Sequence, residues 1–538
     1  MKKLPLKDIK QLPSKPSDVK YQYRRTPMSP IVERELSHIP QLKTSLDDML
    51  NTIRFGRYQL ICYLTLGLIL INDGAEIITL SFLVPILEKD PSWLLNTLEI
   101  EVLASSVFVA ALITSFFSGK LADSFGRRRP LIVIVFLTYI FAMLQAAVSN
   151  YRELLMFRII YGGLVGLQFP MSFSYLAEIT PPYARGKMMV LASGFYAIGG
   201  ILACFLALGY LDNISAGNWR ALFLWIAQPA IICFFLLIYH IKDSPRHLFL
   251  VKRNTEEGIA VLEHIARLNG YRSPYAGVSE ESNSQGGTRN SPFSEKQING
   301  LILWAQNQDG IFVKDAIGNP KTLWVGDYKG ISINIWIIWF VVAIVYHGMA
   351  YYLPLLLATV ENVLVISTDK EQIYEALIIV CAEILSVAIA FLFVDRSRRN
   401  SIMTSFLICG VACLIVFFNE LGMVLVIAIS RVAINVCFAI AIPYTTEIYP
   451  TSIRATGMGF AGACSRFGGV IMPWITISLF KIYPLAPFIA YSALCLLAAY
   501  CCKHISYDTV CADLDYHEMK DRYYEMNSLP PNDSLYRA

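Results

Sequence analysis

Charged side chains are scarce in this sequence. Asp, Glu, Lys and Arg account for 16% of its 538 residues, whereas soluble domains average about 25%. Apolar residues make up 55% of the chain, and the mean hydropathy is +0.50. This composition excludes a string of ordinary soluble domains. The formal net charge of only +4 gives no support for a nucleic-acid partner.

Other chemical signatures are missing as well. The twelve cysteines form no disulfide framework, and the one pair with metal-type spacing, Cys409 and Cys413, lies in an apolar run without a nearby histidine. Residues 1–57 are polar and basic and lack the apolar core of a signal peptide. The sequence contains no Walker-type nucleotide loop and no nucleophile–base or metal constellation. We therefore expect no metal, no cofactor and no enzymatic activity.

Long apolar blocks dominate the rest of the chain. Each is about 20 residues long, which is what a helix needs to cross a ~30 Å hydrocarbon layer. The sequence therefore predicts an all-α protein of the lipid bilayer with twelve transmembrane helices, an even number that places both termini on one side. The blocks cover residues 58–84, 100–118, 130–148, 153–177, 188–211, 220–241, 331–358, 372–394, 401–418, 421–446, 455–480 and 484–503.

The loops between these blocks alternate in charge. One set carries most of the Lys and Arg residues, among them Lys120, Arg128 and Arg396. Short loops rich in Lys and Arg remain on the cytoplasmic side, so this set and both termini are predicted to be cytoplasmic. Within the long linker, Asn254 to Gly270 has the capping and periodicity of an amphipathic helix. The expected divisions are a cytoplasmic N-terminal segment (1–57), a six-helix half (58–241), a cytoplasmic linker with amphipathic helices (242–329), a second six-helix half (330–503) and a cytoplasmic tail (504–538).

The two halves repeat one another. Glu178 and Glu447 each begin a Glu-Ile-x-Pro segment, and an arginine follows seven residues later, as Arg185 and Arg454. The two segments are 269 residues apart, and each follows the fourth span of its half. Halves in the same orientation, related by a pseudo-two-fold axis along the membrane normal, are a known architecture of secondary transporters. Further matches at offsets of 272 to 273 residues are Asp123 with Asp395, Arg127 with Arg399 and Arg158 with Arg431.

Local motifs indicate one family. Residues 119–129, GKLADSFGRRR, resemble the signature loop between helices 2 and 3 of the major facilitator superfamily. Residues 243–246, DSPR, are similar to the segment after helix 6 of its sugar and organic-ion porters, and residues 73–81 are most similar to the group around synaptic vesicle glycoprotein 2. The resemblance implies a solute site between two six-helix halves, exposed to each side in turn by rocking. The chain departs from the pattern at Arg398, which stands where the first half has Gly126, and in the seventh span, which lacks the glutamines that sugar porters use.

Charged residues inside the spans mark the first candidate site, because each costs about 2.5–3.5 kcal/mol at the bilayer centre. Asp73 and Glu76 share one face of the first span, and Arg158 in the fourth span lies at a similar depth by helical rise. Two interpretations are open. The three residues form either a proton- or cation-responsive acid pair with Arg158 as a movable counter-charge, or a static ion pair that holds the two spans together.

The second half contributes further candidates. Glu383, Arg431 and Arg466 lie within its spans. They either line the other wall of the cavity, where a guanidinium holds an anionic group, or pair with one another. Tyr351 and Tyr352 are in the seventh span, which normally lines the cavity in the family that the sequence resembles.

A second cluster of charges falls at the cytoplasmic ends of the helices. Ion pairs among these residues are expected to hold an inner gate shut in the outward-facing state. The alternative is that they are solvated loop charges. The predicted gate comprises Gly119, Asp123, Gly126, Arg127, Glu178, Arg185, Asp395, Arg399, Glu447 and Arg454.

These features predict a monomeric secondary active transporter that moves a small, charged organic solute by alternating access, with a proton or cation as the candidate driving ion. The alternatives are a sugar porter of the same fold and a non-transporting membrane receptor or sensor that kept the fold. The expected location is the plasma membrane or an intracellular vesicle membrane. The fold by itself does not identify the solute.

Overall fold

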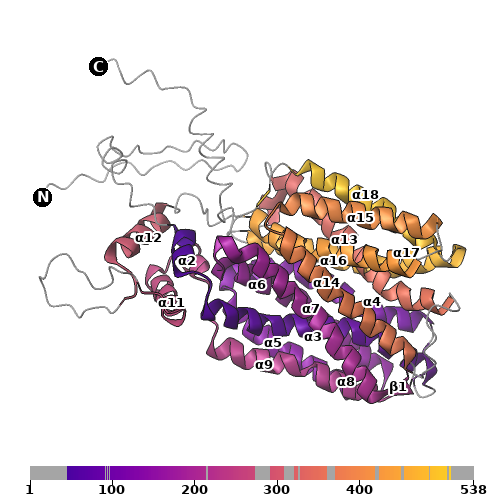
Figure 1. Ribbon diagram of the computed structural model, residues 1–538. Coiled ribbons are helices and arrows are strands. Elements are labelled where there is room, and N and C mark those ends of the chain that lie inside the picture. The colour runs from indigo at the N-terminus through magenta and orange to yellow at the C-terminus, as the bar shows by residue number, and fades with distance from the viewer. Residues whose placement is uncertain are drawn as a thin grey trace, which may run out of the picture. The chain divides into compact units, whose positions relative to one another are not determined.

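Long apolar helices run side by side through the described part of the chain (Figure 1). The computed structural model describes residues 45–90, 93, 95, 97–213, 216–272, 291–307, 320–324, 328–359, 370–418, 423–449, 453–483, 485–505 and 508–509. The membrane-length helices are α3 (Arg57–Lys89), α4 (Thr97–Phe125), α5 (Arg128–Ala146), α6 (Tyr151–Ile179), α7 (Pro182–Tyr210), α8 with α9 (Trp219–Ile226 and Gln228–Tyr239), α13 (Tyr328–Thr359), α14 (Glu371–Phe393), α15 (Arg398–Phe418), α16 (Met423–Ile448), α17 (Arg454–Ile482) and α18 (Ala486–His504).

The prediction of an all-α membrane fold is confirmed. Eleven segments in the described part are long and apolar enough to cross a membrane. The remaining predicted span, residues 455–480, is the 29-residue helix α17. The sixth span consists of α8 and α9, because Pro229 has no N–H to bond the carbonyl four residues earlier and the helix is interrupted at Ala227.

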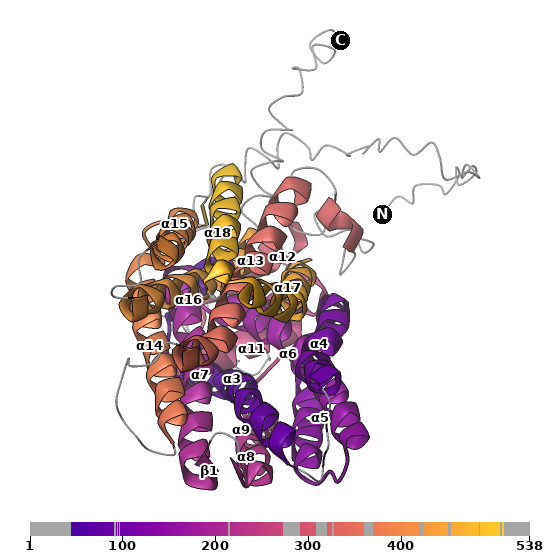
Figure 2. The same ribbon diagram turned by 90° about the vertical axis from the view of Figure 1, so that its right-hand side faces the viewer.

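The helices group into two halves that pack along two seams. In Figure 2, α15, α16 and α18 lie on one side and α4 and α5 on the other. Across the division, α4 packs along α17 and α7 packs along α14. The α4–α17 seam is tight, because a Cβ added to Gly119 would lie 2.1 Å from the Cα of Thr456. Each half also has a proline inside its fourth span, Pro170 in α6 and Pro443 in α16, at the offset of the predicted duplication.

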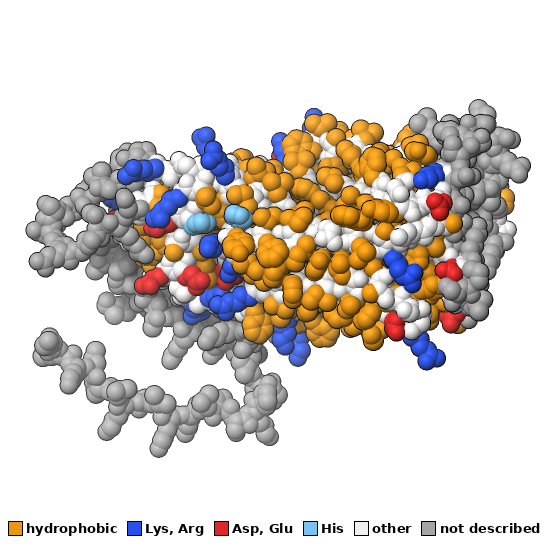
Figure 3. Space-filling view, turned by 90° about the horizontal axis from the view of Figure 1, so that it is seen from below, with side chains coloured by type: hydrophobic (Ala, Val, Ile, Leu, Met, Phe, Trp, Pro, Cys, Tyr) orange, Lys and Arg blue, Asp and Glu red, His pale blue; other side chains and the backbone are white. Residues whose placement is uncertain are grey.

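The surface agrees with a membrane environment. On the face shown in Figure 3, a broad band of apolar side chains covers the middle of the helices, and Lys, Arg, Asp and Glu gather toward the two ends. Exposed apolar side chains of the membrane-length helices include Phe117, Phe205, Ile232 and Leu392. Side chains of this kind belong in hydrocarbon rather than water.

Short helices gather at one end of the bundle, which is called the linker end below (Figure 1). The amphipathic helix predicted between Asn254 and Gly270 is confirmed as α11, where the Asn254 side chain accepts from the backbone N–H of Glu257. At the opposite end, β1 (Leu211–Asn213) pairs with β2 (Ala216–Gly217). The linker-end elements are α2 (Leu46–Ile53), α10 (Pro245–Leu250), α11 (Thr255–Leu268), α12 (Glu295–Asn307) and the 3-10 helix η3 (Pro320–Trp324).

Candidate functional site

Two intramembrane ion pairs lie within single halves. In the first half, Arg158 of α6 donates to Glu76 of α3 at 3.0 Å, and both side chains are almost fully buried. In the second half, Arg431 of α16 donates to Glu383 of α14 at 2.7 Å and to the carbonyl of Tyr346 at 2.6 Å. The Tyr346 hydroxyl also lies 2.9 Å from each Glu383 oxygen. Each pair joins two helices of one half, which is the geometry of a strut.

A third ion pair crosses from one half to the other. Arg466 of α17 donates to Asp73 of α3 at 3.4 Å. Arg466 is 12% exposed, whereas the guanidinium of Arg158 is only 1% exposed. The sequence-based expectation of Arg158 as a shared counter-charge for Asp73 and Glu76 is therefore corrected, because α17 brings its own arginine to Asp73. Arg466 likewise does not pair with Glu383 or Arg431.

The inter-half pair lines a cavity among the helices. The cavity has an empty volume of about 450 Å³ and is also lined by Gly462 and Ser465 of α17. Half of its twelve lining residues are aromatic, which gives it faces for stacking and for cation–π contacts. The aromatic lining residues are Phe169, Tyr196, Trp339, Tyr346, His347 and Phe438.

The two tyrosines predicted to line the cavity, Tyr351 and Tyr352, cannot be compared with it. Tyr351 and Tyr352 lie in α13, but their side chains are outside the described residues. The described part of α13 contributes Trp339, Tyr346 and His347 to the cavity instead. Nothing in the sequence singled out Trp339 or His347, because the rotation of a helix that is apolar on all sides leaves no periodic signal.

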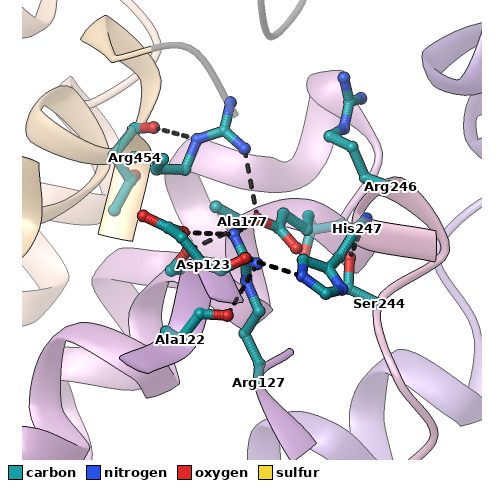
Figure 4. Close-up of polar contacts among 12 residues, drawn as sticks. Ala122, Asp123, Arg127, Ala177, Ser244, Arg246, His247 and Arg454 are labelled. Atoms are coloured by element: carbon teal, nitrogen blue, oxygen red, sulfur yellow. Dashed lines mark hydrogen bonds and ion pairs between the residues drawn. The ribbon is translucent and has the colours of Figure 1, made fainter. Parts of the chain in front are cut away.

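The predicted gate residues of the first half form a buried network at the linker end (Figure 4). Arg127 donates to Asp123 at 3.0 Å and to Glu178 at 2.8 Å. Two contacts bring in the second half: Arg454 lies 3.5 Å from Glu178, and the hydroxyl of Thr456 donates to Asp123 at 3.0 Å. These side chains are buried, so the alternative of solvated loop charges is wrong for them.

The chain is similar in sequence to known transporters. The family model described as sugar (and other) transporter matches residues 73–516, which is most of the chain. The chain belongs to the sugar (and other) transporter family. This family member is 27% identical to the synaptic vesicle 2-related protein of Rattus norvegicus over 84% of this chain and 79% of that protein. It is also 27% identical to organic cation/carnitine transporter 7 of Arabidopsis thaliana, over 81% and 88% of the two chains.

The solved structures agree on the fold. The proton:xylose symporter XylE, bound to 6-bromo-6-deoxy-D-glucose, superposes with a TM-score of 0.68 at 18% identity, covering 87% of this chain and 99% of the other. The protein is therefore a multi-pass membrane transporter with the major facilitator fold, and its relatives are transporters rather than enzymes.

The second half of this transporter family member builds its gate differently from the prediction. Arg398, rather than Arg399, forms the ion pair with Glu447, while Arg399 donates to the carbonyl of Ile505 at 3.0 Å. The reason is the loop before it. Two residues, including Gly126 with φ +87°, separate α4 from α5, whereas four residues without a positive φ separate α14 from α15, so the longer turn of the second half presents the preceding arginine.

The two Glu-Ile-x-Pro segments hold their arginines alike. The Nε of Arg185 donates to the carbonyl of Ala177 at 3.1 Å, and that of Arg454 to the carbonyl of Thr446 at 2.8 Å, eight residues earlier in each case. Lys187, two residues after Arg185, reaches across to Asp395 of the second half at 3.1 Å. The duplicated segments therefore anchor equivalent side chains at the seam.

His247 of α10 forms a hydrogen bond with the backbone of the gate network. Its ring nitrogen Nε2 lies 3.1 Å from the carbonyl of Asp123, and a carbonyl can only accept, so this nitrogen carries the proton. Burial lowers the pKa of His247 to about 4, and the neighbouring Arg127 adds to the effect. The imidazole is thus neutral and acts as a donor to the backbone of the gate.

Proposed function

We propose that this protein is a secondary active transporter that moves a small, charged organic solute by alternating access, with Asp73 and Arg466 as its solute- and ion-responsive pair. The observation that carries the proposal is the location of this pair. It joins the two halves at the wall of the cavity, whereas the other two intramembrane pairs among the described residues each stay within one half. Motion of one half against the other would therefore stretch the Asp73–Arg466 pair and leave the Glu76–Arg158 and Glu383–Arg431 pairs intact.

The chemistry of the pair favours a charged solute. Arg466 has a single hydrogen bond among the described residues, at the long distance of 3.4 Å, so its other N–H groups remain for an anionic group. Asp73 can exchange Arg466 for a proton or for the cationic part of a solute. The aromatic wall then covers a cation or an apolar ring. A solute with both a carboxylate and a cationic group would engage both residues, and the name of the organic cation/carnitine relative is consistent with such a solute.

The gate at the linker end completes the cycle. We place this end in the cytoplasm, because the Lys- and Arg-rich loops lie there. The ion pairs of Glu178 with Arg127 and Arg454 would hold it shut while the cavity faces the other side, and would part when it opens. The name of the synaptic vesicle 2-related relative favours a vesicle membrane as the location.

Two alternatives have weaker support. A sugar porter is suggested by the family description and by the xylose symporter, but the wall of this cavity is aromatic and ionic, and the seventh span lacks the sugar-binding glutamines. A receptor or sensor that kept the fold would not need a gate that parts. The gate ion pairs that cross between the halves favour a protein that moves.

A reconstitution assay tests the proposal. Purified protein in liposomes is screened for uptake of radiolabelled organic cations, carboxylates, zwitterions and hexoses, with and without an imposed pH gradient. We expect concentrative uptake of a charged solute that depends on the gradient. Uptake of a hexose alone would favour the sugar porter. Solute-induced thermal stabilisation without any uptake would favour the receptor.

A further inference from the structure

Asp47 of α2 is a buried carboxylate that lies ten residues before the first membrane helix. Its oxygen Oδ1 accepts from Arg185 of α7 at 3.2 Å and from Arg246 of α10 at 2.5 Å. Its side chain is only 3% exposed. Burial alone would raise the pKa of Asp47, but Arg246, Arg185 and the more distant Arg454 outweigh it and lower the pKa. The carboxylate is therefore ionised at neutral pH, and the N-terminal segment places a fixed negative charge at the linker end.

Asp47 is a carboxylate that two arginines of the gate share. We define the gate cluster as the described buried residues that form ion pairs at the linker end. Removal of Asp47 would take this carboxylate from both Arg185 and Arg246. Guanidiniums that lose a shared carboxylate repel one another more strongly in a buried site. The gate cluster consists of Arg127, Arg185, Arg246, Arg398, Arg454, Asp47, Asp123, Glu178 and Glu447.

Arg185 connects Asp47 to the seam between the halves. The next residue, Gly186, lies so close to Asp395 that an added Cβ would be 2.8 Å from its Oδ1, and Lys187 pairs with the same aspartate. A shift of Arg185 is therefore transmitted to a contact with the second half. The apolar face of α2, with Leu46 and Leu50 buried, would dock the helix without any charge, so docking alone does not explain a carboxylate that is costly to bury.

We propose that Asp47 is a positioning residue of the gate: it holds Arg185 and Arg246 so that the linker end closes, and α2 is a strap that loosens before that end opens. This inference rests on alternating access as proposed above, but it concerns a residue outside both six-helix halves. It assigns to the N-terminal segment a direct part in the conformational cycle.

Hydrogen–deuterium exchange of the full-length protein in lipid nanodiscs tests the inference. The variants are Asp47→Asn, Asp47→Glu, and Asp48→Asn as the matched control on the same helix, since Asp48 caps α2 through Ser45 but contacts no arginine of the gate cluster. Exchange is compared in α2 and in the seam segments 119–127 and 453–460. We expect Asp47→Asn to speed exchange in the seam by about tenfold or more.

The controls separate gating from docking. Asp48→Asn should speed exchange in α2 only, and Asp47→Glu, which keeps the charge, should leave the seam closer to wild type than Asp47→Asn does. The proposal would be overturned if the seam of Asp47→Asn exchanged at the wild-type rate and only α2 exchanged faster. If Asp47→Asn does not fold, Asp47→Glu and Asp48→Asn still distinguish a charge requirement from helix docking.

A double variant tests the electrostatic cause. Asp47→Asn combined with Arg246→Gln removes one charge of each sign, so seam protection should return toward wild type. A double variant more open than Asp47→Asn alone would show that repulsion between Arg185 and Arg246 is not the cause. Exchange requires no solute, so a failure to find the transported solute leaves this result independent of the proposed function.

Discussion

Asp73 on α3 and Arg466 on α17 approach to 3.4 Å and connect the first half to the second at the wall of the cavity. Glu76, one helical turn from Asp73, instead pairs with Arg158 inside the first half at 3.0 Å. Neighbouring carboxylates of one helix therefore have different partners. Because only contacts between halves change when the halves move, the two acids are expected to respond differently to neutralisation.

Neutralising Asp73 should abolish transport while sparing the fold. In Asp73→Asn, Arg466 loses its carboxylate partner but still faces the cavity, where water can hydrate the guanidinium. The melting temperature should therefore stay close to that of the wild type. Concentrative uptake should disappear, because no carboxylate exchanges Arg466 for a proton or a cation. Both quantities are measured on one preparation. A strongly destabilised variant whose remaining uptake keeps the wild-type pH dependence would end the coupling hypothesis.

Neutralising Glu76 provides the contrast. Glu76→Gln leaves the guanidinium of Arg158 buried without its carboxylate. Breaking a buried pair in this way typically costs about 3–5 kcal/mol, so the main effect should be a lower melting temperature and a lower yield of folded protein. Thermal unfolding in detergent checks this. A variant as stable as wild type would show that the pair is not a strut.

Closure of the linker end should depend on Gly119. A methyl group there would lie 2.1 Å from the backbone of Thr456 across the seam, so Gly119→Ala should push α4 from α17 and favour the state in which the linker end is open. Accessibility of seam residues to a water-soluble reagent added at the linker end measures this. Gly209→Ala is the control, because nothing lies within 4 Å of its added Cβ. Equal accessibility in the two variants would contradict the prediction.

The two neighbouring arginines of the second half should differ in their effect. Arg398→Gln removes an ion-pair partner of the buried Glu447, whereas Arg399→Gln removes a part-buried hydrogen bond to the carbonyl of Ile505. We expect Arg398→Gln to lose most of its turnover. Arg399→Gln should lose little turnover, and its free energy of unfolding should fall by only about a few tenths of a kcal/mol. Initial uptake rates and melting temperatures of both variants decide between them. The reverse order would support the gate role that the sequence predicted for Arg399.

His247 should make stability sensitive to mild acid. Its pKa is lowered to about 4 from an ordinary 6.5, because burial and the charges of Arg127 and Lys252 oppose protonation more than Glu178 favours it. Above pH 6.5 the imidazole is neutral in both folded and unfolded chains. As the pH falls from 6.5 toward 4, only the unfolded chain gains the proton, so the free energy of unfolding falls by up to about 3 kcal/mol. Melting temperatures from pH 7.5 to 4.5 should show this slope in wild type and a shallower one in His247→Gln; parallel slopes would contradict the assignment.

Charges at helix ends were predictable where a local repeat marked them. Glu178 and Arg454 were identified because the same short segment occurs twice, and the structure brings them together across the seam. The prediction failed by one residue at Arg399, where the duplicated loop lacks the glycine that sets the turn in the first half. A repeat in sequence therefore implied a repeat in structure only where the backbone conformation could also be repeated.

The sequence by itself determined the membrane class, the spans and the duplication, because apolar length and repeated segments are properties of consecutive residues. Only the tertiary structure decided which acid meets which arginine. Depth along a helix follows from residue number, but rotation about the helix axis does not when every face is apolar. Asp73 therefore reached Arg466, 393 residues away, and Asp47 reached Arg246, through the packing of whole helices rather than through any local pattern.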